Sequence, residues 1–313
     1  MADKFDAILI IAFGGPEKTE DIRPFLANVT RGRPIPKERI DEVAHHYELI
    51  GGRSPINELT FKQARGLELA LKGRGSALPI FVGMRNWHPF LAKAVNEMSR
   101  ANVRHAIGVI MAAHESEASW QRYKQNVSDA IAETGAELSV EYTPPLFDHP
   151  LFIESVSDRV EECLIQIPDT DRNDTTLVFT AHSIPTPMAY ESPYVEQLTE
   201  SSRLVAERLG HENWTLAYQS RSGRPTDPWL EPDVCDVIRD LSARGVKYVV
   251  VAPIGFVCDH VEVLYDLDIE AAGVARKVGI KLIRAKAVND DPKFIAALAD
   301  VVEKHMRDGA KNK

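Results

Sequence analysis

The sequence predicts an α/β protein of two halves, each an open, parallel, doubly wound sheet flanked by helices. Three observations predict this fold class. Short apolar runs alternate along the whole chain with longer segments of helical periodicity. The first run, residues 5–12, is uninterrupted, as expected for a parallel strand covered on both faces. Finally, no low-complexity linker separates the halves, so we expect a cleft between them, with ligands at the carboxyl ends of the strands.

The elements follow in order from these patterns. The first strand ends in a Phe-Gly-Gly-Pro turn, and a helix begins near Thr19 with acids in its first turn. An irregular segment with two prolines comes before a helix that ends near Ile50, and Asn57 could cap the next one. The expected strands are 5–12, 79–84, 103–112, 138–142, 176–180, 214–219, 246–253 and 280–285. The later expected helices are 89–100, 120–133, 150–166, 194–209, 234–244, one entered at Asp259, and 292–307.

The length and composition of the chain limit the classes of protein to which it can belong. A chain of 313 residues suits two domains, which we place at 1–145 and 146–313, and the last helix could pack back on the first. The net charge of −9 argues against a nucleic-acid partner. The opening apolar run is too short for a signal peptide or membrane span, and the three scattered cysteines form no disulfide framework. We expect a cytoplasmic monomer without an integral membrane segment.

The stretch 253–272, PIGFVCDHVEVLYDLDIEAA, carries an acidic pattern. Glu262, Asp266 and Glu270 recur every fourth residue, so in a regular helix their carboxylates share one stripe. Like charges at this spacing destabilise an isolated helix by about 0.2–0.5 kcal/mol per pair. An unfavourable stripe that begins where a strand ends suggests a track for cations.

A purely structural interpretation of this stretch stands beside the metal track. Asp259 followed by Glu262 is also a helix-capping pattern, in which a side-chain oxygen accepts free N–H groups. Asp266, Asp268 and Glu270 could simply form a solvated face.

A histidine lies at another expected strand end. His182 is followed by Ser183 and Pro185, which delay the next helix, and an imidazole there can accept a proton or bind a metal. Alternatively, it is hydrogen-bonded to a neighbouring turn. Together with Glu262 it would form a sparse ligand set that leaves room for a substrate. The chain has no GxSxG, GxxxxGK[ST] or HExxH motif, which argues against the corresponding hydrolase, nucleotide and protease sites.

Four motifs extend this picture: TAHSIP around His182, PIGFVCDHVEVLYDLDIE around Glu262, DPWLEPDV ending at Val234, and HHYELIGGRSPIN around Ser54. On these motifs the chain resembles the ferrochelatase family, including its bacterial coproporphyrin branch, over essentially its whole length. The resemblance implies two Rossmann-like domains of the class II chelatase type with a porphyrin cleft between them. It also implies a lyase of haem biosynthesis that inserts Fe²⁺ into the macrocycle and releases two protons.

The resemblance also implies residue roles. His182 matches the histidine that binds metal or accepts pyrrole protons, and Glu262 matches the catalytic glutamate. Asp266 and Glu270 match an acidic ridge that leads metal in or protons out, so the implied metal-contacting set is His182, Glu262, Asp266 and Glu270. The implied contacts with the porphyrin or its carboxylates are Phe13, Arg31, Tyr47, Ser54 and Tyr123. Tyr47 and Tyr123 could equally be core residues of their helices.

Two departures from the family pattern bear on the substrate. Phe13 stands where some relatives have a Tyr, and His46 stands where related bacterial enzymes often have Arg, so pairing with a propionate there is in question. The chain also lacks a cysteine-bearing C-terminal extension, so we expect no iron–sulfur cluster and no cofactor, with Fe²⁺ as a substrate.

The segment 24–50 is short and carries cations where membrane-associated, protoporphyrin-using relatives have an apolar lip. This favours coproporphyrin III, with its four propionates, as the porphyrin. The alternatives are a protoporphyrin IX ferrochelatase, a cobalt chelatase, or a non-catalytic haem- or metal-binding protein on the same scaffold.

Overall fold

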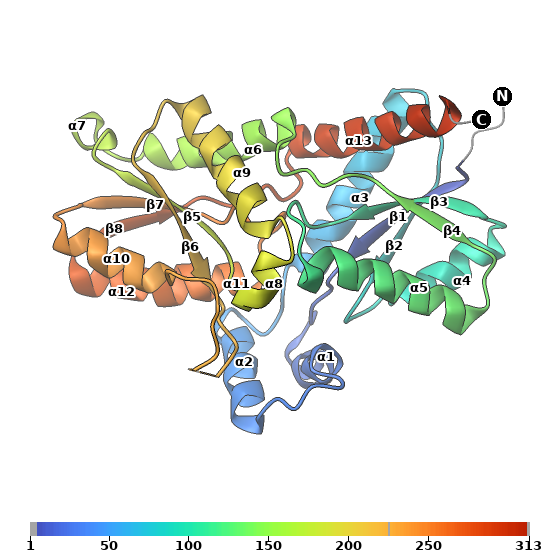
Figure 1. The fold of residues 1–313 in the computed structure, drawn as a ribbon, viewed down its shortest axis with the longest axis horizontal. Coiled ribbons are helices and arrows are strands. Elements are labelled where there is room, and N and C mark those ends of the chain that lie inside the picture. The colour runs from blue at the N-terminus through green and yellow to red at the C-terminus, as the bar shows by residue number, and fades with distance from the viewer. Residues whose placement is uncertain (1–4, 225, 312–313) are drawn as a thin grey trace. The chain divides into compact units, whose positions relative to one another are not determined.

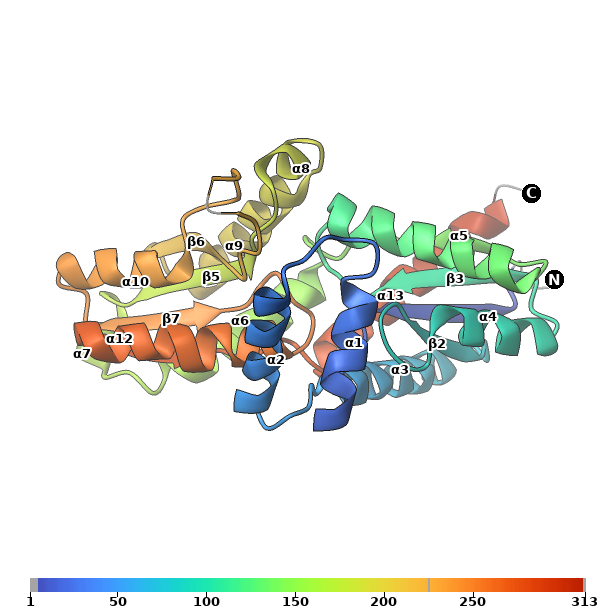
Figure 2. The ribbon, with the colours of Figure 1, turned by 90° about the horizontal axis from the view of Figure 1, so that it is seen from below.

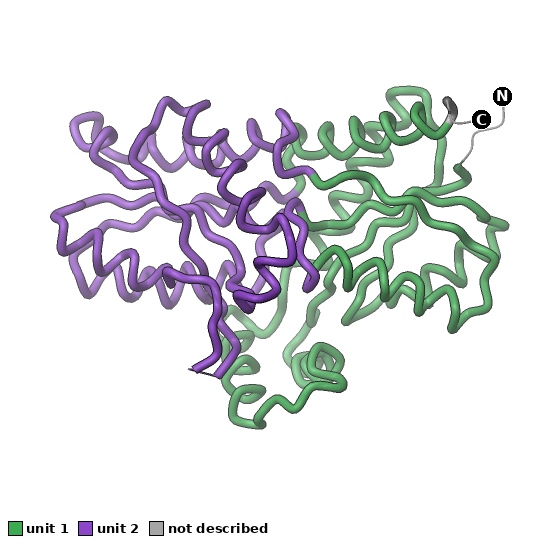
Figure 3. The backbone as a smooth tube through the Cα atoms, in the orientation of Figure 1, with its two compact units in different colours: residues 1–112, 119–145, 290–313 green, residues 113–118, 146–289 purple. Residues whose placement is uncertain are grey.

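The computed structural model describes residues 5–224 and 226–311. These divide into two compact units (Figure 3). Unit 1 comprises the described residues up to 112, then 119–145 and those from 290 onward, and unit 2 comprises 113–118 and 146–289. The chain passes between units at 145/146, where sequence reasoning places the domain boundary. Two segments depart from a simple N- and C-terminal division: residues 113–118 join unit 2, and the last helix joins unit 1.

Unit 1 is built on a four-stranded parallel sheet of order β2-β1-β3-β4. Its strands are β1 (Ala7–Ala12), β2 (Ile80–Met84), β3 (His105–Ile110) and β4 (Ser139–Tyr142). Its helices are η1 (Thr19–Asp21), α1 (Ile22–Val29), α2 (Lys37–Leu49), α3 (Ile56–Gly73), α4 (Leu91–Arg100), α5 (Arg122–Thr134) and α13 (Pro292–Lys311), and the π-helical segment η2 (Glu117–Gln121) precedes α5.

Helices cover both faces of this sheet, as the uninterrupted apolar strand predicts (Figure 1). On one face, Leu9 and Ile11 of β1 belong to a core cluster with buried residues of α4 and α5. On the other face, α3 and α13 pack against each other and against the sheet. The fold class expected from the sequence is therefore confirmed in this unit.

Unit 2 repeats the plan with the order β6-β5-β7-β8, again all parallel. Its strands are β5 (Thr176–His182), β6 (Trp214–Gln219), β7 (Tyr248–Ala252) and β8 (Lys281–Arg284). Its helices are α6 (Pro150–Leu164), α7 (Asp169–Arg172), α8 (Thr186–Tyr190), α9 (Tyr194–Leu209), α10 (Val234–Ala243), α11 (Val261–Leu264), the π-helical segment η3 (Asp266–Ala271) and α12 (Ala272–Val278).

Side chains of successive residues in the central strands point to opposite faces of the unit 2 sheet. Val249 and Val251 of β7 belong to a cluster with α10, η3 and α12, and α10 and α12 lie side by side across that face (Figure 2). Helices α6 and α9 pack together on the other face. Within residues 5–224 and 226–311, no helix has the length and apolar content that a membrane crossing requires.

His114 holds the segment 113–118 in unit 2. Its Nε2 lies 2.9 Å from the Ser201 hydroxyl of α9, which itself donates to the Phe147 carbonyl, so the imidazole N–H is the donor to Ser201. The next residue, Glu115, donates its backbone N–H to the Gln197 side chain at 2.7 Å. Burial lowers the pKa of His114 to about 3. The buried imidazole is therefore neutral in the folded chain.

This burial predicts a pH-dependent stability. Between the ordinary histidine pKa of about 6.5 and the folded value of about 3, only the unfolded chain binds the proton, so stability falls as pH falls. The slope is at most about 1.4 kcal/mol per pH unit, or about 2 kcal/mol from pH 6.5 to pH 5. In urea unfolding, His114→Gln should lose about that much less stability than wild type over this interval. The exposed His105→Gln serves as the control. An equal acid sensitivity of His114→Gln and wild type would contradict the assignment.

Candidate active site

The residues of interest gather at the carboxyl end of the unit 2 sheet. His182 is the last residue of β5, and its register partner Gln219 is the last residue of β6. The neighbouring strand β7 leads into the acidic segment that carries Glu262. In parallel α/β sheets ligands bind at this edge, because the connections leave it open.

The neighbours of the two ring nitrogens define the chemistry of His182. Its Nδ1 bonds to the backbone carbonyl of Ser183, and because a carbonyl can only accept, the proton lies on Nδ1. In the neutral imidazole Nε2 is then the nitrogen with the lone pair, and this atom lies 3.5 Å from the Glu262 carboxylate. The two side chains are 30% and 31% exposed, so both are accessible to a substrate. The interpretation of His182 as a histidine bonded to a neighbouring turn is confirmed at Nδ1, and its role in binding a proton or metal through Nε2 stays a prediction.

The short distance between His182 Nε2 and the Glu262 carboxylate determines what the two groups can bind together. A neutral imidazole Nε2 and an ionised carboxylate do not hydrogen-bond to each other, but both bind a proton or a metal cation placed between them. The pair can therefore take up a proton and keep the resulting imidazolium stable beside a negative charge. In the part of the chain that the structure describes, no three His, Cys, Asp or Glu side chains converge as a metal-binding group.

The acidic segment differs from the regular helix that its spacing predicts. The helix begins at Val261 rather than Asp259, and after one turn it widens into the π-helical η3, where the Glu270 N–H bonds to the Tyr265 carbonyl. The cap is His260, whose Nδ1 accepts the Glu262 N–H at 3.2 Å. Burial lowers the pKa of His260, so this capping imidazole stays neutral.

Asp259 and Asp268 have structural partners instead. Arg284, at the end of β8, donates to Asp259 at 2.8 Å and to both oxygens of Asp268 at 2.7 Å. Asp259 also accepts from the Asn289 side chain and from the backbone of Ala287. The capping role expected for Asp259 is therefore wrong, since its carboxylate is occupied by residues 25 and more positions away.

The three carboxylates of the expected stripe lie in different surroundings. Glu262 lies beside His182, Asp266 is buried and accepts a hydrogen bond from the Ser220 hydroxyl, and Glu270 is exposed. Burial, with the nearby charges of Asp233 and Glu270, raises the pKa of Cys235 in α10 to about 12. The π-helical segment that carries Glu270 packs against α10.

The five predicted porphyrin contacts all belong to unit 1. Phe13 follows β1 and packs edge-on against Phe25, which packs in the same way against Tyr47. Tyr123 is a buried core residue of α5, and Phe13 is packed against the same cluster. Tyr47 is buried as well, at 4% exposure. The core interpretation of the two tyrosines thus agrees with their burial, whereas Phe13 is only partly buried.

The two polar residues among the predicted porphyrin contacts, Arg31 and Ser54, lie in different surroundings. Arg31 is exposed beyond α1 and donates to the Asn28 side chain at 2.7 Å. Ser54 is buried, its N–H bonds to the Pro16 carbonyl, and it lies where a side chain on Gly15 would clash. His46 is partly buried, and burial followed by the charge of Arg39 lowers its pKa.

Sequence reasoning missed four residues of the site. Tyr194 donates its hydroxyl to the His182 carbonyl at 3.2 Å, and burial raises the pKa of that hydroxyl. Gln219 and Ser220 bond to the acidic segment from the end of β6, and Arg284 does so from β8. The predicted strands that end at residues 219 and 285 place these residues at the carboxyl edge of the sheet. No local sequence pattern predicts which side chains they contact there.

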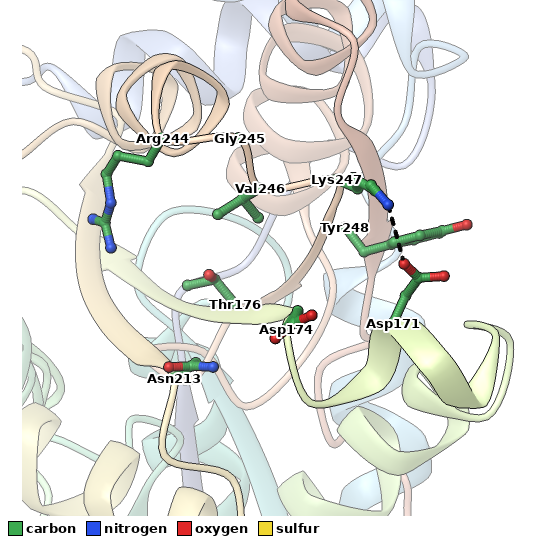
Figure 4. A pocket seen from close by; sticks show the side chains of 9 residues that line it. All are labelled: Asp171, Asp174, Thr176, Asn213, Arg244, Gly245, Val246, Lys247 and Tyr248. Carbon is green, nitrogen blue, oxygen red and sulfur yellow. Dashed lines mark ion pairs between the residues drawn. The ribbon is translucent and has the colours of Figure 1, made fainter.

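A separate hollow of about 310 Å³ lies at the amino ends of β5, β6 and β7 (Figure 4). It contains the ion pair of Lys247 with Asp171, at 3.5 Å, and none of the residues predicted for the site. Its lining is Asp171, Asp174, Thr176, Asn213, Arg244, Gly245, Val246, Lys247 and Tyr248. It lies at the opposite end of the sheet from His182.

Comparison with solved structures supports the fold. SirB from Bacillus subtilis with Fe³⁺ superposes with a TM-score of 0.62 over 97% of both chains, at 11% identity. The sirohydrochlorin chelatase SirB of the subspecies spizizenii, in complex with cobalt, gives 0.57 at 10% identity. At these identities the likeness concerns the fold alone.

Comparison with sequences settles the family. The ferrochelatase family model matches residues 5–306. The coproporphyrin III ferrochelatase of Streptomyces griseus is 43% identical over 317 residues, which is 95% of this chain and 84% of the relative. The ferrochelatase of Rhodopirellula baltica is 40% identical, over 96% of this chain and 86% of the relative. As its motifs predict, the chain belongs to the ferrochelatase family, enzymes that insert metal into a porphyrin.

Proposed function

We propose that this enzyme inserts Fe²⁺ into coproporphyrin III, giving Fe-coproporphyrin III (coprohaem), and that it does so in the cytoplasm as a monomer. The main observation in support of this reaction is that His182 Nε2 and the Glu262 carboxylate are accessible and lie 3.5 Å apart. The substrate assignment is supported by relatives named coproporphyrin III ferrochelatase, at 39–43% identity, and by the cationic segment between residues 24 and 50.

Proton balance defines what His182 and Glu262 would do. Two pyrrole N–H protons must leave as one Fe²⁺ enters, so charge is conserved and the site needs proton acceptors. In this proposal His182 Nε2 takes a pyrrole proton. The imidazolium that forms is stabilised on both sides, by the Ser183 carbonyl at Nδ1 and by Glu262 at Nε2. Glu262 assists in the exchange of iron for protons.

Asp266 and Glu270 would continue the path. Asp266 is buried on the next turn after Glu262, and Glu270 is exposed one turn further along the same segment. The carboxylates of Glu262, Asp266 and Glu270 thus follow one another from the accessible pair, through a buried position, to an exposed one. This order suits the passage of cations or protons between the site and solvent. This remains a proposed role for both residues.

Residues of unit 1 would hold the macrocycle. The partly buried Phe13 offers a flat apolar surface, and Tyr47 and Tyr123 support the aromatic cluster behind it. The exposed Arg31 guanidinium can pair with a propionate. Ser54, which fits against Gly15, would contribute mainly to the shape of the turn after β1.

We further propose that the enzyme carries no organic cofactor and no iron–sulfur cluster. Burial raises the pKa of Cys163 to about 11 and those of Cys235 and Cys258 to about 12. These thiols are therefore protonated near neutral pH, and among the described residues no three His, Cys, Asp or Glu side chains converge to hold a cluster. Iron enters this proposal only as a substrate.

The first functional prediction concerns His182. With coproporphyrin III and Fe²⁺ in excess, wild type should form product over many turnovers, and His182→Ala should lower kcat by at least about 100-fold, as expected for removal of a general base. His211→Ala is a matched control, because His211 also bonds through a ring nitrogen to a backbone carbonyl, at the amino end of the sheet. Full turnover by His182→Ala would refute the assignment. Formation of one metalloporphyrin per protein without turnover would identify a carrier instead.

The second functional prediction concerns the porphyrin. We expect a higher kcat/KM for coproporphyrin III than for protoporphyrin IX, because two additional propionates can meet the cations of segment 24–50. Arg31→Ala should reduce that preference by about tenfold, corresponding to the loss of roughly one charge-assisted hydrogen bond. Arg23→Ala is the control, because Arg23 is already paired with Asp41 at 2.7 Å. Equal or greater activity with protoporphyrin IX would overturn the substrate assignment while leaving the chemistry intact.

A further inference from the structure

The end of strand β6 is bonded to both catalytic elements of unit 2. The Gln219 carbonyl accepts the Ser183 N–H at 2.8 Å, next to His182. The Gln219 side-chain amide donates to the Glu262 backbone carbonyl, and the Ser220 hydroxyl donates to the Asp266 carboxylate. Two consecutive residues therefore hold His182's neighbour and two successive turns of the acidic segment. We call Gln219 and Ser220 the β6 latch.

The β6 latch has two locally unfavourable features. Ser220 has a φ of 62°, in the left-handed region that favours Gly and Asn and is disfavoured for other residues. The Gln219 Oε1 is buried and accepts no hydrogen bond from the described residues. Such features persist where the surroundings impose them, and they cluster at functional sites. Neither feature is required to end a strand, and both occur at the two residues that bond to positions 262 and 266.

The acidic segment needs such an anchor. Its first helix, α11, spans only Val261–Leu264, and the π-helical turn that follows has a wider and less regular ladder of hydrogen bonds. Arg284 holds Asp259, which precedes α11, and Asp268, which lies within the π-helical turn. The β6 latch holds the intervening carbonyl of Glu262 and carboxylate of Asp266.

We propose that the β6 latch positions Glu262 for catalysis, with Ser220 acting as a positioning residue through Asp266. The inference rests on the proposed function, because it explains how the Glu262 carboxylate is kept beside His182 Nε2. Loss of the Ser220 hydroxyl would let the π-helical turn shift. A displacement of about 1 Å between reacting groups can reduce a rate by about a hundredfold.

Three variants of Ser220 separate positioning from stability. Ser220→Gly removes the hydroxyl and accepts the left-handed backbone, so its Tm should be unchanged or raised while kcat falls about tenfold or more, with KM for coproporphyrin III unchanged. Ser220→Asn also tolerates this backbone and offers an amide donor to Asp266, so it should recover most of the lost kcat. Ser220→Ala loses the hydroxyl but keeps the strain, so kcat should fall without a gain in Tm.

Asn102→Gly is the matched control. Asn102 is exposed in unit 1 and has a φ of 59°, so this variant places glycine at the same backbone conformation without touching the acidic segment, and kcat should not change. Gln219→Met tests the other half of the latch, because it removes the donor to Glu262 and the unpaired acceptor together. Its kcat should fall while the folded fraction stays that of wild type.

The outcomes distinguish this inference from the function on which it rests. If His182→Ala is inactive while Ser220→Gly and Gln219→Met turn over at the wild-type rate, the β6 latch has no role in positioning and this inference fails alone. If wild type itself inserts no iron, the proposed function fails and the inference falls with it. A stable, slow Ser220→Gly that is rescued by Asn establishes the positioning role.

Discussion

The hydrogen bond from His182 Nδ1 to the Ser183 carbonyl determines which ring nitrogen is available to a substrate. Because the acceptor is a backbone atom of the next residue, a rotamer change alone cannot easily exchange it for another partner. Ser183 is itself fixed, since its N–H bonds to Gln219 and its hydroxyl bonds to the Leu230 carbonyl. The proton therefore stays on Nδ1, and Nε2 remains an acceptor that faces Glu262.

The structure tolerates five acids within the twelve residues 259–270 because their carboxylates have different surroundings. Asp259 and Asp268 share the Arg284 guanidinium, which is only 13% exposed and balances their charge. Asp266 is stabilised by the Ser220 hydroxyl. Glu262 and Glu270 retain exposed surface. The mutual repulsion that the sequence suggests is therefore reduced by partners from β6 and β8, and the carboxylate left beside His182 is the one that can meet a substrate.

Patterns with a local cause were predictable from the sequence. The apolar run of β1 and the turn residues after β5 and β7 place His182 and the acidic segment at strand ends, because burial and backbone restriction act within a few residues. The π-helical turn was not predictable, since its hydrogen bonds depend on what holds the segment in place. The spacing of Asp259 and Glu262 suggests a cap, yet Arg284 and Asn289 outcompete the local N–H groups for Asp259. Likewise, residues 113–118 belong to unit 2 because His114 is hydrogen-bonded to Ser201, 87 positions later in the chain.

The arrangement at His182 and Glu262 is more favourable with a cation than without one. With a neutral imidazole the two acceptors, 3.5 Å apart, gain nothing from each other, whereas a proton taken up at Nε2 adds an interaction with Glu262 and leaves the bond from Nδ1 to Ser183 intact. The folded chain supports this arrangement through contacts elsewhere: Tyr194 at the His182 carbonyl, Gln219 at the Glu262 carbonyl, and Arg284 at the flanking acids. A proton or metal ion that enters between Nε2 and the carboxylate interacts favourably with both groups. In the proposed function, this arrangement would be preorganised for the charged state reached during metal insertion, where electrostatic preorganisation lowers a barrier.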